Sequence, residues 1–153
     1  MSYTFRTLSF VACLAALAAT ASAQETPIKI GFLTTLSGPA GSIGQELADG
    51  FKLGLAKTRD MLGGRKVVVH YADDQAKPDI GRQHADKLVE SDKVDILTGV
   101  NFSNVLLAIA KPVLDAGVLY VSANAGPSQL AGKQCHPNFF AASFQNDTTS
   151  EAM

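Results

Sequence analysis

Short apolar segments with strand character alternate with amphipathic helical segments along most of this chain, and this alternation constrains the fold more than any other feature. Short runs typical of buried strands lie at residues 28–34, 66–72, 94–99 and 118–122, and residues 138–143 form a candidate fifth strand. Between them, apolar residues recur at spacings of three and four, as on one face of a helix, in residues 44–59, 78–90 and 105–114. Pro78 favours a helix start, and Gly63-Gly64 and Gly117 are predicted to end the first and third helices.

Alternating strands and helices at this spacing predict right-handed crossovers and a parallel sheet with helices on both faces. The expected fold class is therefore a doubly wound α/β layer. In such sheets ligands bind beyond the carboxyl ends of the strands, where loops and helix N-termini converge. This rule selects four loops before any motif is considered: residues 37–43, 73–74, 101–104 and 123–127.

The first 23 residues are predicted to be a secretory signal peptide rather than part of the fold. Arg6 precedes an apolar stretch at residues 8–19, and Ala21-Ser22-Ala23 supplies small residues for cleavage after Ala23. The apolar stretch is shorter than the roughly 20 residues that cross a bilayer, so no stable membrane insertion is expected after cleavage. Lipid attachment at Cys13 is the alternative, although the residues before Cys13 lack the usual leucine.

Composition excludes several classes of protein. With 46% hydrophobic residues in 153, the chain can bury a core, which excludes intrinsic disorder. The 13 Lys and Arg against 14 Asp and Glu give a net charge of -1, which argues against nucleic-acid partners and polybasic membrane binding. After signal cleavage only Cys135 remains, so it stays free or pairs with a cysteine outside this sequence. Residues 147–153 look like a helix cap and first turn.

The sequence contains no recognisable motif for catalysis, a cofactor or a metal. Residues 38–44 lie at a strand-to-helix junction but match neither phosphate-binding glycine spacing, so no nucleotide is expected. Asp73 and Asp74 are adjacent on an extended segment and would point to opposite faces, so we predict that they cap a loop or are solvated. No nucleophile elbow is present, and metal-ligand spacing is absent from the three histidines, His70, His84 and His136. We therefore predict a non-enzymatic protein without cofactors.

The segment Asn101-Phe102-Ser103-Asn104 separates the third strand from the third helix, and Ser103 or Asn104 is predicted to cap that helix. The same hydroxyl and the first amides of the helix would favour a ligand carboxylate through charge-assisted hydrogen bonds. Phe102 would be a costly exposed aromatic unless something packs on it. The loop after the fourth strand, residues 123–127, is small and polar, so its backbone amides can approach a ligand.

Five short motifs occur in a fixed order along the chain: Ile28-Lys29-Ile30-Gly31; Leu36-Ser37-Gly38-Pro39; Tyr71-Ala72-Asp73-Asp74 with Pro78; Gly99 with Ser103; and Val121-Ser122 after Gly117. In this order they resemble the type I periplasmic substrate-binding proteins of ABC transporters, in the branch of the leucine/isoleucine/valine-binding protein. The resemblance implies a periplasmic protein that captures a small solute between two lobes, closes by a hinge motion and delivers the solute to a membrane permease. It also implies that residues 24–153 are the first lobe, with the second lobe absent. A ligand-sensing receptor domain of the same fold is the alternative.

The same resemblance implies roles for individual positions. Ser103 matches the serine that binds the ligand carboxylate in branched-chain amino-acid binders, and Ala125 lies in the loop whose backbone assists. Gly126 stands where those binders have a threonine that helps hold the α-ammonium group, and Ile43 stands where they have a tyrosine near the ligand. A carboxylate ligand without an α-amino group is therefore expected, for example an aromatic acid stacked near Phe102; a branched-chain or other amino acid is the alternative. The complete set of expected ligand-binding residues is Ser37, Ile43, Asn101, Phe102, Ser103, Asn124, Ala125 and Gly126.

Overall fold

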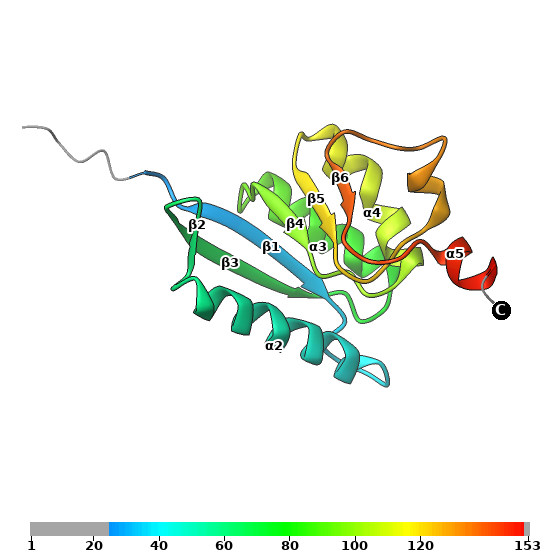
Figure 1. The fold of residues 1–153 in the computed structure, drawn as a ribbon, viewed down its shortest axis with the longest axis horizontal. Coiled ribbons are helices and arrows are strands. Elements are labelled where there is room, and N and C mark those ends of the chain that lie inside the picture. Colours follow the sequence, from blue (N-terminus) through cyan, green and yellow to red (C-terminus); the bar gives the residue numbers. More distant parts are fainter. Residues whose placement is uncertain (1–24, 152–153) are drawn as a thin grey trace, which may run out of the picture.

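A six-stranded sheet of order β2-β3-β1-β4-β5-β6 forms the centre of the molecule (Figure 1). The computed structural model describes residues 25–151, so the predicted signal peptide and its cleavage site lie outside the described residues. Strands and helices alternate as the sequence predicts. In chain order the elements are β1 (Ile28–Thr34), α2 (Gly41–Lys57), β2 (Met61–Leu62), β3 (Arg65–Asp73), α3 (Pro78–Glu90), β4 (Ile96–Thr98), α4 (Ser103–Asp115), β5 (Leu119–Ser122), the 3-10 helix η1 (Ser128–Ala131), β6 (Phe139–Ala141) and α5 (Asn146–Glu151).

Five of the strands run parallel to one another. β1 pairs with β3 on one side and with β4 on the other, β4 pairs with β5, and β5 pairs with β6. β2 adds a short antiparallel pairing at the β3 edge. The predicted doubly wound parallel α/β sheet is confirmed, and the carboxyl ends of the parallel strands meet at one edge of the sheet.

Helices cover both faces of this sheet. Phe32 on β1 points to one face, where its ring centroid lies 4.7 Å from that of Phe51 on α2. Its neighbour Leu33 points to the opposite face, as successive strand residues do, and belongs to the core that α3 and α4 build. In Figure 1, α2 accordingly lies away from α3 and α4. The main core between the sheet and these two helices is formed by buried apolar residues such as Ala85, Leu88, Leu97, Val105, Ile109 and Val113.

The segment that follows α2 differs from the prediction. The helix ends at Lys57, and Gly63 and Gly64 lie further along, in the tight turn that joins β2 to β3. Both glycines have positive φ values, 57° and 84°, in a backbone region that favours glycine. The prediction that this pair ends the helix is therefore wrong, because the pair forms a hairpin turn instead. The two-residue β2 and the four-residue η1 were not predicted, since neither is long enough to show a periodic pattern.

The last part of the described chain follows the prediction with shorter elements. The fifth parallel strand, expected at residues 138–143, is confirmed as the three-residue β6. The expected helix start near Asp147 is confirmed as α5, which begins one residue earlier, at Asn146. Residues 142–145 therefore carry the chain from the carboxyl end of β6 to α5, at the same edge of the sheet as the candidate loops.

Candidate functional site

The sheet has one position where the chain leaves neighbouring strands in opposite directions. From β1 the chain crosses to β3 on one side, and from β3 it returns past β1 to β4 on the other side. The loops after β1 and β4 diverge here, and doubly wound proteins bind ligands at such a switch point. The expected ligand-binding residues lie around it: Ser37 and Ile43 after β1, Asn101, Phe102 and Ser103 after β4, and Asn124, Ala125 and Gly126 after β5.

Asn101 connects three of these strand ends from a buried position. The Thr34 hydroxyl at the end of β1 donates to Asn101 Oδ1 at 3.1 Å. Asn124, after β5, donates through Nδ2 to the Asn101 carbonyl oxygen at 2.9 Å. The Asn101 side chain is buried, and its Nδ2 has no partner among the described residues. Asn101 and Asn124 therefore hold the loops after β1, β4 and β5 together.

No side chain within residues 25–151 caps the start of α4. Phe102 occupies the N-cap position with an extended backbone (φ -113°, ψ 135°), and Ser103 is already the first helical residue. The prediction that Ser103 or Asn104 caps the helix is therefore wrong. Phe102 is partly buried and packs against the hydrophobic core, so the protein covers part of this ring. Among the described residues, no side chain caps these first-turn amides and no acidic residue stands in the turn, so the helix end can accept an anion.

Ser103 accepts a hydrogen bond from Asn146, a residue that the sequence analysis did not identify. Asn146, the first residue of α5, donates through Nδ2 to Ser103 Oγ at 3.0 Å. The backbone N–H of Asn146 also donates to the carbonyl oxygen of Gly126 at 2.8 Å. Asn146 thus connects the loop after β5 to the start of α4. The contact joins residues 43 positions apart, and no local motif in the sequence indicates it.

Gly126 lies where the chain leaves no space for a side chain. A Cβ atom built on Gly126 would lie 2.1 Å from the carbonyl oxygen of Phe144, far inside contact distance. The preceding Ala125 is buried, and its carbonyl oxygen accepts a hydrogen bond from the Ser122 hydroxyl. The loop after β5 therefore offers backbone atoms, and no side-chain hydroxyl, at position 126.

The two aspartates after β3 anchor the loop after β1. Asp73 Oδ1 accepts from the Leu36 amide at 2.8 Å and from the Gln75 amide at 2.9 Å. Burial alone would raise the pKa of Asp73, but hydrogen bonds from the Ser37 hydroxyl and from these amides outweigh burial and lower the pKa below its usual value. Asp74 is buried and accepts from the Thr35 hydroxyl at 2.5 Å. The predicted loop-capping role of both residues is confirmed.

Ser37 and Ile43 lie at the outer side of the candidate site. The Ser37 hydroxyl lies close enough to Asp73 to contribute to the lowered pKa of that carboxyl. Ile43 stands in the first turn of α2 with 47% of its surface exposed. Hydrogen bonds thus join the residues after β4 and β5 into one group, while Ile43 is an exposed apolar side chain on α2.

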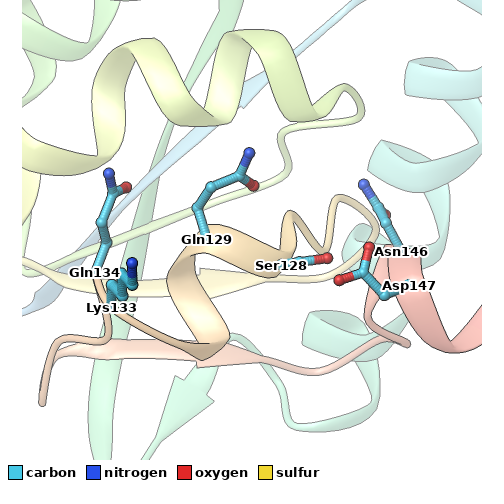
Figure 2. A pocket seen from close by; sticks show the side chains of 6 residues that line it. All are labelled: Ser128, Gln129, Lys133, Gln134, Asn146 and Asp147. Carbon is cyan, nitrogen blue, oxygen red and sulfur yellow. The ribbon is translucent and has the colours of Figure 1, made fainter.

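A polar hollow of about 590 Å³ lies beside this group (Figure 2). In Figure 2, Asn146 and Asp147 lie at one side of the hollow, and Lys133 and Gln134 lie at the other. The hollow is lined by Ser128, Gln129, Lys133, Gln134, Asn146 and Asp147, and by none of the eight expected ligand-binding residues. Asn146 connects it to Ser103.

Neither a cluster of metal-binding side chains nor a membrane-spanning helix occurs within residues 25–151. Across residues 25–151, no group of three or more His, Cys, Asp or Glu side chains is arranged to hold a metal ion. In the same range, no helix combines the length and the apolar character that a membrane span requires. Cys135 is free and exposed between η1 and β6.

Sequence comparison assigns this arrangement to a family. Residues 27–153 match the family described as periplasmic binding protein. The chain belongs to the periplasmic binding protein family. Its mostly parallel sheet and flanking helices match one lobe of the type I members, as the sequence motifs predicted.

Three relatives of this periplasmic binding protein illustrate the match. The Leu/Ile/Val-binding protein BraC3 of Rhizobium johnstonii is 31% identical over 129 residues, 83% of this chain and 34% of that protein. A solute-binding protein of an ABC transporter from R. palustris, solved in complex with benzoate, has a TM-score of 0.79 and 30% identity over 83% of this chain and 35% of its own. An ABC transporter substrate-binding protein from Sphaerobacter thermophilus has a TM-score of 0.75 and 32% identity over 79% and 33%. The chain spans about a third of the length of these relatives.

Proposed function

We propose that this chain is the first lobe of a solute-binding protein of an ABC transporter, and that it binds the carboxylate group of a small ligand at the start of α4. The observation that carries the proposal is the uncapped first turn of α4, with the Ser103 hydroxyl beside its free amides. Amides at a helix N-terminus and a hydroxyl donor together form a charge-assisted site for an anion. The family and its ABC-transporter members support this role.

Within this proposal, the favoured ligand is an aromatic carboxylate without an α-amino group. Position 126 has neither a side-chain hydroxyl nor the space for one, so the loop after β5 lacks a side-chain acceptor for an ammonium group there. The R. palustris relative was solved with benzoate, which is such an acid. An amino-acid ligand is the second candidate, because BraC3 is named for leucine, isoleucine and valine.

The remaining parts of the proposed function follow from the family. The ligand would be captured in the periplasm, after removal of a signal peptide by cleavage at Ala23, and delivered to a membrane permease. A second lobe outside residues 25–151 would complete the binding cleft, and a tethered ligand-sensing receptor of the same fold is the alternative context. We infer no catalysis, cofactor or nucleic-acid partner, and turnover of any bound carboxylate would refute the non-enzymatic role.

A thermal-shift comparison of benzoate and leucine on the intact secreted protein tests the ligand class. Because a ligand that binds the folded state stabilises it by RT ln(1 + [L]/Kd), benzoate at 100 times its Kd would add about 2.7 kcal/mol. We expect benzoate to raise the melting temperature and leucine to leave it unchanged. Stabilisation by leucine but not benzoate would favour the amino-acid candidate. Stabilisation by neither, across a panel of carboxylates, would contradict the carboxylate proposal.

Replacement of Ser103 by alanine tests the site itself. Loss of a hydrogen bond to a charged group costs about 1.5–3 kcal/mol, so we expect the Kd for the stabilising carboxylate to rise roughly 10- to 150-fold. Isothermal titration calorimetry measures this change. Ser91→Ala is the matched control, because Ser91 is exposed at the far end of α3 and should leave the Kd unchanged. If Ser103→Ala binds the carboxylate with the same Kd as the wild type, Ser103 does not contribute to the binding site.

A further inference from the structure

We propose that Asn146 sets the direction of the Ser103 hydroxyl, and that this makes position 103 select ligand groups that accept hydrogen bonds over groups that donate them. The inference rests on the binding role proposed for Ser103 above. It assigns a positioning role to a residue of α5 that lies outside the eight expected ligand-binding residues. This role is supported by the 3.0 Å hydrogen bond from Asn146 Nδ2 to Ser103 Oγ.

The position of Asn146 is fixed by its own backbone. Its N–H donates to the Gly126 carbonyl oxygen at 2.8 Å, so the first residue of α5 is attached to the loop after β5. The absence of a side chain at Gly126 lets the Phe144 carbonyl approach that loop closely. The segment 144–146 therefore lies against the site through main-chain contacts, and the Asn146 side chain reaches Ser103 from a defined point.

The chemistry of the two groups gives the contact a direction. An amide NH₂ group only donates, whereas a serine hydroxyl has one proton and two lone pairs. With Nδ2 as the donor, Ser103 Oγ is the acceptor, and its own proton is not used by Asn146. Among the described residues, the Ser103 hydroxyl has no recorded acceptor, so its proton is available to a ligand.

The ligand-facing groups at the start of α4 are then mainly donors. The first-turn amides of α4 have no side-chain acceptor within residues 25–151, and the Ser103 hydroxyl adds one more donor. A carboxylate can accept from all of them, while one lone pair of Ser103 Oγ is already occupied by Asn146. A ligand ammonium or carboxamide NH₂ group would face the same donors and would find only the second lone pair of Ser103 Oγ as an acceptor. Position 146 thus contributes to the discrimination between acids and their neutral amides.

Replacement of Asn146 by aspartate tests this direction with almost no change in shape. An ionised carboxylate only accepts, so the Ser103 proton would turn toward Asp and be lost to the ligand. We expect the Kd for benzoate to rise at least tenfold, and the Kd for benzamide to change much less. The ratio of the two affinities, measured by calorimetry on the intact protein, should fall at least tenfold. A purely structural role of Asn146 would weaken both ligands equally and leave the ratio unchanged.

Two further variants separate this inference from other causes. Thr148→Asp adds the same charge to the same exposed helix without contacting Ser103, and it should change the affinity ratio less than threefold. In a Ser103→Ala background, Asn146→Asp should change the ratio less than twofold, because its effect passes through the hydroxyl. Leucine and leucinamide replace benzoate and benzamide if leucine is the stabilising ligand.

The outcomes also separate this inference from the proposed function. If Ser103→Ala leaves carboxylate binding intact, or if no carboxylate binds, the proposed site fails and the role of Asn146 fails with it. If Ser103→Ala weakens binding but Asn146→Asp keeps the wild-type ratio, the site stands and the inference about Asn146 is overturned. That second result would mean that the Asn146 carbonyl, rather than its NH₂ group, faces Ser103.

Discussion

Replacement of Phe32 by alanine is expected to destabilise the protein by about 3–5 kcal/mol, the usual cost of removing a fully buried aromatic ring. Phe32 is only 1% exposed. Its ring centroid lies 4.7 Å from that of Phe51 and 5.4 Å from that of Tyr71, so the ring fills the space between α2 and the sheet. Urea denaturation followed by circular dichroism, with the transition slope compared to the wild type, measures the loss.

Leu53→Ala is the control for this experiment. Leu53 lies on α2, the helix that packs on Phe32, but 61% of its surface is exposed, so its truncation should cost less than about 1 kcal/mol. A loss of similar size in both variants would mean that burial of the Phe32 ring does not determine the effect. A loss below about 1 kcal/mol for Phe32→Ala would contradict the packing of α2 on β1 described here.

Replacement of Gly44 by alanine is expected to give the second large effect, a loss of about 3 kcal/mol or more. A Cβ atom at Gly44 would lie 1.9 Å from the carbonyl oxygen of Thr35, at the point where α2 crosses the end of β1. Because the nearest atom belongs to the backbone, the helix or the loop after β1 must move to relieve the clash. Urea denaturation of the variant measures the cost.

The same helix offers a control with the opposite expected sign. Gly50 lies further along α2, and a Cβ atom there would have nothing within 4 Å. Gly50→Ala should therefore stabilise the protein by about 0.4–1 kcal/mol, since alanine has less freedom than glycine in the unfolded chain. If both alanine variants shift stability in the same direction, the close approach of α2 to Thr35 does not determine the effect at Gly44.

The fold was predictable because its elements follow local rules that are visible in the chain. Pro78 starts α3, as its fixed φ and missing N–H favour, and α3 ends at Glu90 as predicted. The apolar stripe of α4 is buried as expected, including Val105, Ile109 and Val113. The role of Gly63-Gly64 was predicted wrongly because a glycine turn can either end a helix or close a hairpin. The two residues of β2 that precede this pair are too few to show a strand pattern.

The candidate site was only partly predictable. The switch-point rule selected the loops after β1, β4 and β5, which the structure joins by hydrogen bonds, because the rule depends on strand order alone. The capping role of Ser103 was wrong by one position, because N-cap preference does not say which residue the chain leaves in an extended conformation. The contact between Ser103 and Asn146 spans 43 residues and depends on how α5 packs, so no window of the sequence contains it.

The uncapped start of α4 implies a trade-off between stability and function in this protein. A helix of 13 residues without a side-chain cap forgoes about 1 kcal/mol that a serine or aspartate at position 102 would supply. Such a cap would make the empty protein more robust, but it would also occupy the amides that the proposed ligand needs. Phe102 supplies no such cap, and it stabilises the start of the helix by packing its ring against the core instead. At this helix end, a substitution that raises the stability of the unliganded protein is therefore expected to lower its affinity for the ligand.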